Sequence, residues 1–345
     1  MIVTPIDFIK ESKTGIKIID VRTPAEFNHA HFPNAVNLPL LNEEERKIIG
    51  ITFKQQGREA AIIKGFELVG HKFSGFIKAA LKIAPEKKIL VYCWRGGLRS
   101  NILAWLLQTS GFRVTLLKGG YKSFRNWALA TINESKKVIV IGGKTGCGKT
   151  EILNHLKKKS QQVIDLEKLA SHRGSAFGSI GLPEQPSNEQ FENLLALEWY
   201  DADENKILFL ENESRRIGKI VIPQNVFELM RSANVMEISA DKEQRTKRIL
   251  DEYGKYGTEI LIEKTKKIAD KLGGLRLKEA IVYLENNQLE NWCEMMLEYY
   301  DKQYTHSSHQ RNPQTIVKSK ADITNLDKAC EHILKEINEC FDIRK

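Results

Sequence analysis

Short apolar runs alternate with helix-period segments over the first 130 residues. Ile16–Val21, Ile89–Tyr92 and Val114–Leu117 are rich in β-branched and large apolar residues, a composition that predicts buried strands. Residues 101–107 carry apolar side chains at helical spacing, so a helix is expected there. Strands that alternate with helices are typical of α/β domains.

The same alternation restarts after a polar stretch at residues 133–137. Four strands and three helices are expected in this second region: strands 138–142, 162–166, 206–210 and 235–239, and helices 149–159, 188–203 and 224–232. This order favours a parallel sheet covered by helices. Beyond Asp241 the pattern is mostly helical, with one late strand at 315–317 and a last helix at 326–341.

The predicted fold class is therefore α/β, with three regions along the chain. We expect an N-terminal domain over residues 1–132, a parallel-sheet domain over 137–240, and a helical region over 241–345 that packs on the second domain.

Composition narrows the class of protein. The chain has 345 residues, 41% of them hydrophobic and 28% charged, which excludes collagen-like and wholly disordered proteins. Its five cysteines are scattered without a CxxC pair, so neither a disulfide framework nor a zinc knuckle fits. No apolar run approaches the roughly 18 residues of a membrane span. We expect a cytoplasmic protein with no membrane partner.

The positive charge is concentrated at the N-terminal end. Residues 1–134 carry 20 Lys and Arg against 11 Asp and Glu, whereas residues 135–345 carry 33 of each. Such a basic domain favours a polyanionic partner such as RNA, because each neutralised phosphate releases counterions. A charge that serves only solubility is the alternative.

Cys93 follows an expected strand and begins the sequence Cys-Trp-Arg-Gly-Gly-Leu-Arg-Ser. Backbone N–H groups around a glycine-rich loop converge on an anion, and Ser100 is expected to cap the following helix. The predicted catalytic group is Cys93, with Arg95, Gly96, Gly97, Arg99 and Ser100 as anion-binding residues. A buried, inert cysteine is the alternative.

A second glycine-rich loop follows the strand at 138–142 and has the spacing G-x4-G-K-T. In such a loop, backbone N–H groups wrap a diphosphate, the lysine bridges its oxygens, and the threonine reaches Mg²⁺. The predicted diphosphate-binding residues are Gly143, Lys144, Thr145, Gly146, Cys147, Gly148, Lys149 and Thr150.

Further candidates surround this loop in the sequence. Glu211 ends a strand where nucleotide hydrolases often place a metal-binding carboxylate, which makes it a candidate for metal or tRNA contact, and no metal is assigned. Arg215 and Arg216 are expected to contact RNA or diphosphate, or else to form surface ion pairs. His172 and Arg173 begin a long loop rich in Gly, Ser and Pro, a type of loop that is usually functional. Residues 241–248 resemble the arginine helix of nucleotide kinases, with a solvated charged face as the alternative.

The cysteine loop resembles the active loop of rhodanese-type domains. Residues 19–37 and 117–127 match the same fold, and the resemblance implies supporting roles for Asp20 and Arg22. Arg99 lies six residues after Cys93, which is the spacing of phosphatases built on this fold. Phosphatase action therefore stays open beside sulfur or selenium transfer.

The combination of both loops resembles the bacterial tRNA 2-selenouridine synthase family over essentially the full length. Residues 172–178 and 211–218 agree with it. The resemblance implies a transferase that replaces sulfur by selenium at the wobble 2-thiouridine of tRNA. Its substrates would be selenophosphate and geranyl diphosphate, with a geranylated intermediate and no tightly bound cofactor, although Mg²⁺ stays open. The alternatives are a rhodanese-type sulfurtransferase or phosphatase fused to a small-molecule kinase, which would turn over ATP without RNA, and a non-catalytic anion sensor.

Overall fold

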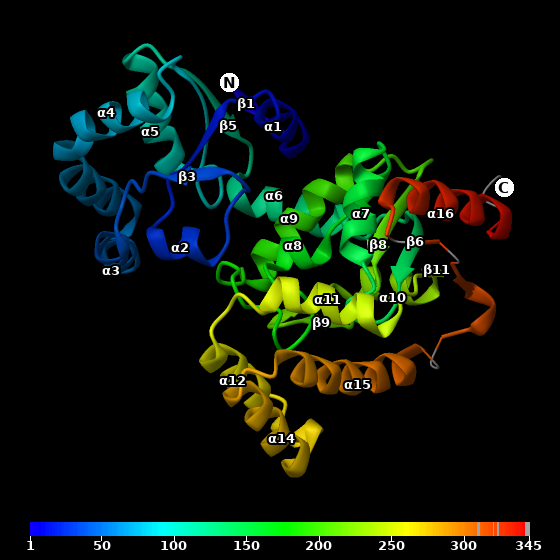
Figure 1. Cartoon of the computed structure of the whole chain (residues 1–345). Coiled ribbons are helices and arrows are strands. Elements are labelled where there is room, and N and C mark those ends of the chain that lie inside the picture. The colour runs from blue at the N-terminus through cyan, green and yellow to red at the C-terminus, as the bar shows by residue number, and fades with distance from the viewer. Residues whose placement is uncertain (309–310, 320, 323, 342–345) are drawn as a thin grey trace. The chain divides into compact units, whose positions relative to one another are not determined.

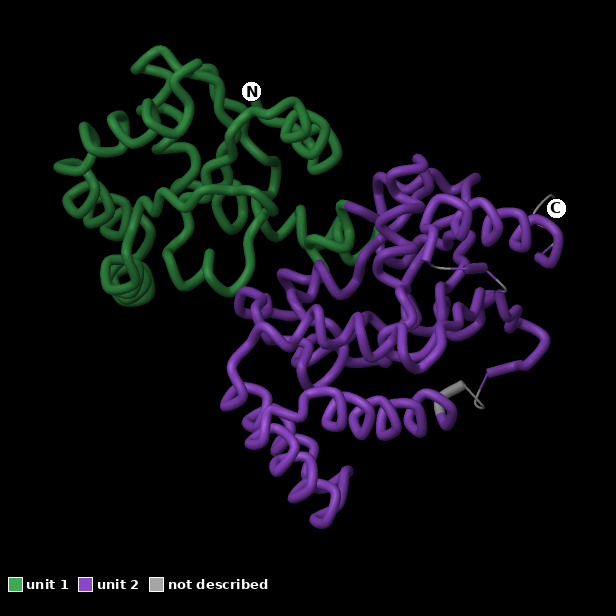
Figure 2. Tube along the Cα trace, in the orientation of Figure 1, with its two compact units in different colours: residues 1–131, 192–197 green, residues 132–191, 198–345 purple. Residues whose placement is uncertain are grey.

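A computed structural model of the chain describes residues 1–308, 311–319, 321–322 and 324–341. It divides into two compact units (Figure 2), residues 1–131 with 192–197 and residues 132–191 with 198–345. No helix in these described ranges is long and apolar enough to cross a membrane.

Unit 1 contains one five-stranded parallel sheet (Figure 1). Its strands are β1 (Ile2–Val3), β2 (Lys17–Asp20), β3 (Ala35–Asn37), β4 (Lys88–Tyr92) and β5 (Arg113–Leu117), in the order β1-β5-β4-β2-β3. Its helices are α1 (Pro5–Ser12), α2 (Pro24–His29), α3 (Glu43–Val69), α4 (Phe73–Ile83), α5 (Leu98–Thr109) and α6 (Gly120–Thr131). The central strand β4 is buried from Ile89 to Tyr92, as expected for a strand covered on both faces.

Unit 2 contains a second parallel sheet with the order β12-β11-β6-β8-β7. These strands are β6 (Lys137–Gly142), β7 (Gln162–Ile164), β8 (Ile207–Glu211), β11 (Asn234–Glu237) and β12 (Ile316–Lys318). The helices are α7 (Lys149–Lys158), α8 (Leu166–Ala170), α10 (Gln224–Ser232), α11 (Lys242–Tyr253), α12 (Thr258–Lys266), α13 (Ala269–Leu272), α14 (Gly274–Glu285), α15 (Leu289–Ser308) and α16 (Leu326–Cys340). Helix α9 (Asn188–Asp201) is divided between the units, because its residues 192–197 belong to unit 1. A small hairpin pairs β9 (Arg216–Ile217) with β10 (Ile220–Val221).

The two parallel sheets confirm the predicted α/β class, and the region after Asp241 is mostly helical as expected. The expected late strand is β12, and it pairs with β11. The pairing of Ile141 in β6 with Glu211 in β8 brings the carboxyl ends of these strands together. The phosphate loop and Glu211 therefore meet at one sheet edge, where open α/β sheets usually bind ligands.

Candidate functional site

The phosphate loop connects β6 to α7, and Gly148 is the N-cap of that helix. Lys149 donates from Nζ to the carbonyl of Gly143 at 3.2 Å and lies 3.7 Å from a carboxylate oxygen of Glu211. Although burial opposes the charged form, the surrounding acidic groups hold the pKa of Lys149 above its ordinary value. The loop therefore presents a cation beside the N-terminus of a helix, the arrangement that binds phosphate.

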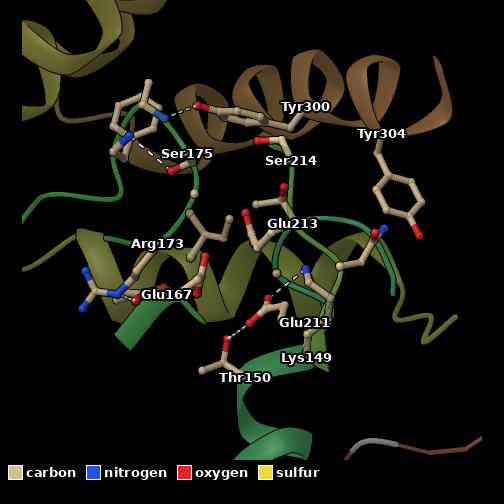
Figure 3. Close-up of a pocket in the computed structure, with 18 of the residues that line it drawn as sticks. Lys149, Thr150, Glu167, Arg173, Ser175, Glu211, Glu213, Ser214, Tyr300 and Tyr304 are labelled. Carbon is tan, nitrogen blue, oxygen red and sulfur yellow. Dashed lines mark hydrogen bonds and ion pairs between the residues drawn. The ribbon is translucent and has the colours of Figure 1, made fainter. Parts of the chain in front are cut away.

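Three carboxylates face this lysine: Glu167 from α8, Glu211 at the end of β8, and Glu213 just beyond it (Figure 3). One oxygen from each lies within 4.8 Å of the others. Burial, reinforced by the neighbouring carboxylates, raises the pKa of Glu167 to about 10 and that of Glu213 to about 8. Such oxygen ligands suit Mg²⁺, and Thr150 adds a hydroxyl 3.5 Å from Glu211.

Gly174 allows the loop after α8 to pass directly over two of these carboxylates. Its φ is +64°, and a Cβ there would lie 2.8 Å from Oε2 of Glu213 and 3.2 Å from Oε1 of Glu167. A larger residue would be strained and would also clash with the acidic cluster. The glycine at position 174 therefore lets the long loop lie against the carboxylates of Glu167 and Glu213.

Two arginines of α11 donate hydrogen bonds to backbone carbonyls of the phosphate loop. Arg245 is buried, donates to the carbonyl of Thr145 at 2.8 Å and pairs with Asp301, which also pairs with Lys144 at 3.2 Å. Arg248 donates to the carbonyl of Gly146 at 3.4 Å and lines the site. These contacts show that the arginine helix is not merely a solvated charged face.

A cavity of about 1500 Å³ opens over the phosphate loop within unit 2. Figure 3 shows Lys149 and Thr150 along one side and α15 with Tyr300 and Tyr304 along the other, with the carboxylates between them in this view. Several apolar and aromatic side chains also line the cavity, among them Phe177, Ile249, Tyr253, Ile268, Trp292, Met296, Leu297 and Tyr299. The cavity thus combines a phosphate grip with an apolar wall.

The aromatic residues of α15 belong to this wall and to the core beneath it. Trp292 is 1% exposed and donates to the hydroxyl of Thr265 at 3.2 Å, and the hydroxyl of Tyr300 accepts from the backbone N–H of Ala176 at 3.1 Å. Trp292 therefore serves mainly as core, which is the usual role of aromatic residues at helical spacing.

The structure distributes the remaining candidates of unit 2 between the cavity and its surroundings. Arg173 and Arg215 line the cavity, and Arg173 pairs with Glu252 at 2.5 Å. His172 is buried and does not line the cavity. Its Nδ1 has no hydrogen-bond partner in the part of the chain that the structure describes, and burial lowers its pKa. Arg216 is exposed on β9 and also lies outside the cavity lining. Within the predicted loop 143–150, only Lys144 and Cys147 do not line the cavity.

The cysteine loop of unit 1 forms a compact turn between β4 and α5. Two donors reach the sulfur of Cys93: the backbone N–H of Gly97 and the hydroxyl of Ser100, each at 3.2 Å. Ser100 does not cap α5, because the N-cap is Gly97 and Ser100 lies inside the first helical turn. Cys93 is 3% exposed, so only a small part of it faces solvent.

The loop closes against α6 through Gly120. Its φ is +60°, and a Cβ there would lie 2.3 Å from the carbonyl oxygen of Cys93. That carbonyl accepts from the backbone N–H of Tyr121 at 2.8 Å. The first residues of α6 therefore hold the cysteine loop in place.

The arginines expected around Cys93 have separate environments. Arg99 is ion-paired with Glu26 of α2 at 2.7 Å, whereas Arg95 is exposed, and no hydrogen bond or ion pair of its side chain is found among the described residues. Arg22 forms a buried pair with Asp20 at 2.7 Å. Asp20 also accepts from the hydroxyl of Tyr92 at 2.7 Å, so this pair fixes the strand that precedes the cysteine.

Comparison with known proteins covers both domains. A family model described as the tRNA 2-selenouridine synthase AAA domain matches residues 136–332, and a rhodanese-like domain model matches residues 5–126. A tRNA 2-selenouridine synthase from Sulfurovum sp. is 38% identical over 86% of this chain and 90% of its own length. The chain belongs to the tRNA 2-selenouridine synthase family.

Two further relatives and one solved structure match parts of the chain. The synthase from Nitrosomonas eutropha is 34% identical over 82% of this chain and 86% of its own length. The synthase from Nitrosomonas europaea is 40% identical over 68% of this chain, and the match spans 63% of that relative. A solved N-terminal domain from Clostridium difficile 630 is 35% identical over 37% of this chain and 99% of that domain, with a TM-score of 0.35.

Membership in the tRNA 2-selenouridine synthase family confirms the predicted resemblance, the rhodanese and phosphate-loop domains, and the transferase class. The sequence did not single out Glu167 as a site residue. Its signal is positional, because it follows β7 at the sheet edge that also carries Glu211. Arg231, which lines the cavity, was not predicted either, because it lies in the last turn of an ordinary amphipathic helix.

Proposed function

We propose that this chain converts the wobble 2-thiouridine of tRNA to 2-selenouridine in two steps, with geranyl diphosphate bound in the cavity of unit 2 and selenophosphate at the cysteine loop of unit 1. The observation that carries the proposal is the cavity itself. It places an apolar, aromatic wall next to a phosphate loop, which suits a prenyl diphosphate better than a free polar nucleotide.

In the first step, the thiocarbonyl sulfur attacks C1 of the geranyl group. A carbon–sulfur bond forms, the carbon–oxygen bond to diphosphate breaks, and the N3 proton of the base is released. Diphosphate leaves with more negative charge at the breaking bond, and Lys149 and the loop N–H groups stabilise that charge. Where Mg²⁺ is bound, Glu167, Glu211, Glu213 and Thr150 would hold it, and it would further neutralise the diphosphate.

In the second step, selenium of selenophosphate attacks C2 and geranylthiol leaves. Water cleaves the phosphorus–selenium bond to give phosphate, and its two hydrogens supply N3–H and the thiol. Alkylation makes this exchange feasible because a thiol departs more readily than sulfide. We assign this step to the cysteine loop, where Cys93 accepts two hydrogen bonds and Arg95 is exposed to meet an anion.

The proposed partner is tRNA. The stacked anticodon base must leave its stack before either step, so the chain must bind the surrounding RNA as well as the base. The basic composition of residues 1–134 is consistent with such a polyanion. A separate enzyme would supply selenophosphate in the cytoplasm, and no cofactor would be tightly bound.

Mass spectrometry of tRNA nucleosides tests this proposal. Cells that lack the protein are complemented with wild-type chain, Lys149→Ala or Cys93→Ser. We expect selenouridine only with wild type, neither modified base with Lys149→Ala, and geranylthiouridine that accumulates with Cys93→Ser. ATP turnover without any change in tRNA would instead support a small-molecule kinase, and full selenation by Cys93→Ser would contradict the assignment of the second step.

A further inference from the structure

One wall of the cavity is built from α10 and the segment after β8. Phe227 and Arg231 are four residues apart in α10 and therefore lie on the same helix face. The guanidinium carbon of Arg215 lies 5.9 Å from the centroid of the Phe227 ring. All three side chains line the cavity, and we call them the basic wall.

The arginines of the basic wall differ from other arginines of the cavity in their partners. Arg215 donates to the side-chain oxygen of Gln224, which is uncharged. Neither Arg215 nor Arg231 has an ion pair in the ranges that the structure describes. By contrast, Arg173 and Arg248 in the same cavity pair with Glu252 and Glu151.

A third cation lies behind this wall. Arg311 is 6% exposed and donates to the carbonyls of Met230 and Arg231 at 2.9 and 3.3 Å and to Oδ1 of Asn212 at 2.8 Å, all of them neutral acceptors. Its Nε has no hydrogen-bond partner among the described residues. Burial, with the nearby charge of Arg231, lowers its pKa to about 10, so the group stays charged at neutral pH.

Helix capping does not explain Arg231. A basic residue in the last turn of a helix often stabilises the terminal carbonyls. Here Arg311 already donates to those of Met230 and Arg231, and the Arg231 side chain is half-buried at the cavity. Two arginines without an ion pair among the described residues therefore line the cavity, and they favour an anionic ligand there.

We propose that Arg215 and Arg231 bind the RNA backbone phosphate that flanks the modified nucleotide, while the Phe227 ring contacts a base beside it. The inference rests on the proposed function and adds the RNA contact to it. The diphosphate of the prenyl donor already has the loop N–H groups and Lys149. Two cavity-lining guanidinium groups beside a half-buried aromatic ring suit a phosphodiester with its attached base.

Binding of a tRNA that carries 2-thiouridine, followed by fluorescence anisotropy at several salt concentrations, tests this inference. We expect Arg215→Gln and Arg231→Gln each to weaken tRNA binding several-fold and to reduce the salt slope by about one. Phe227→Leu should weaken binding without changing the slope. Calorimetry on the same variants should give unchanged affinity for geranyl diphosphate.

Three results would overturn the inference. The first is unchanged tRNA affinity and salt slope in both arginine variants. The second is a loss of geranyl diphosphate affinity instead, which would assign the basic wall to the donor. The third is an equal effect of Lys328→Gln, which removes one charge from an exposed position of α16 outside the cavity. Failure of the wild-type chain to bind either ligand would instead overturn the proposed function, and the inference with it.

Discussion

The hydroxyl of Ser100 lies 3.2 Å from the sulfur of Cys93 and 3.1 Å from the carbonyl of Gly97. Its single proton can serve only one of these acceptors at a time. A thiolate is the stronger acceptor, so ionisation of Cys93 draws the proton toward sulfur.

Ser100→Ala should therefore slow the reaction of Cys93 with electrophiles. A hydrogen bond to a charged group contributes about 1.5–3 kcal/mol, so we expect the rate of alkylation by iodoacetamide at neutral pH to fall about tenfold or more. Ser100→Thr keeps the hydroxyl and should react at nearly the wild-type rate. Equal rates for the alanine variant and wild type would show that the Gly97 N–H alone is sufficient.

Glu26 should make the stability of the chain dependent on pH in the acid range. Burial disfavours its charged form, but the hydrogen bond and charge of Arg99 prevail and lower its pKa. A depressed carboxyl pKa contributes stability above the unfolded value of about 4.3, and that contribution is lost as pH falls through the folded pKa. Thermal unfolding should show that Glu26→Gln lowers the melting temperature at pH 7 and has a smaller effect near pH 3.

Gly174→Ala should displace the loop after α8 from the carboxylates of Glu167 and Glu213. The added methyl group would meet Glu213 at 2.8 Å in a backbone conformation that alanine avoids, at a cost of roughly 1–3 kcal/mol. We expect a lower melting temperature and weaker binding of geranyl diphosphate. Gly75→Ala is the control, because nothing lies within 4 Å of its position in α4, and it should lower neither the melting temperature nor the affinity. If the two variants behave alike, the loop does not depend on this contact.

The acidic cluster should respond to pH in the opposite direction from Glu26. Because the pKa of Glu213 is about 8 and that of Glu167 about 10, the folded chain holds protons that unfolded carboxyls release. Stability without divalent cations should therefore fall as pH rises from the unfolded carboxyl pKa of about 4.3 towards these folded values, and Glu167→Gln should reduce the loss by at least about 1 kcal/mol. Mg²⁺ should raise the melting temperature more at pH 8.5 than at pH 6, because its ligands must lose their protons.

Local patterns predicted most of the framework. The strands at 138–142 and 206–210 and the loop between them have strong apolar and glycine signals, and they fold as β6, β8 and the phosphate loop. The long helix α3 had no such signal, because Ile51 and Phe53 are exposed and Gly57 interrupts the helix at a φ of +86°. Its apolar positions do not follow one buried face.

Side-chain contacts between residues far apart in the chain could not be predicted from the sequence. Arg99 is close to Cys93 in the chain, yet its partner is Glu26, which lies 73 residues away. The sign of charge at a loop can be read from one segment, but the neutralising group comes from another element. The role of Arg311 could not be predicted for the same reason, because its contacts with α10 and Asn212 join distant parts of unit 2.

The central claim, that the phosphate-loop cavity holds a prenyl diphosphate, is tested most directly by calorimetry with three ligands on the wild-type chain. Geranyl diphosphate should bind at least about a hundredfold more tightly than inorganic diphosphate, because the apolar wall buries its hydrocarbon chain. It should also bind more tightly than ATP. Equal affinity for geranyl diphosphate and inorganic diphosphate, or tighter binding of ATP, would contradict the account.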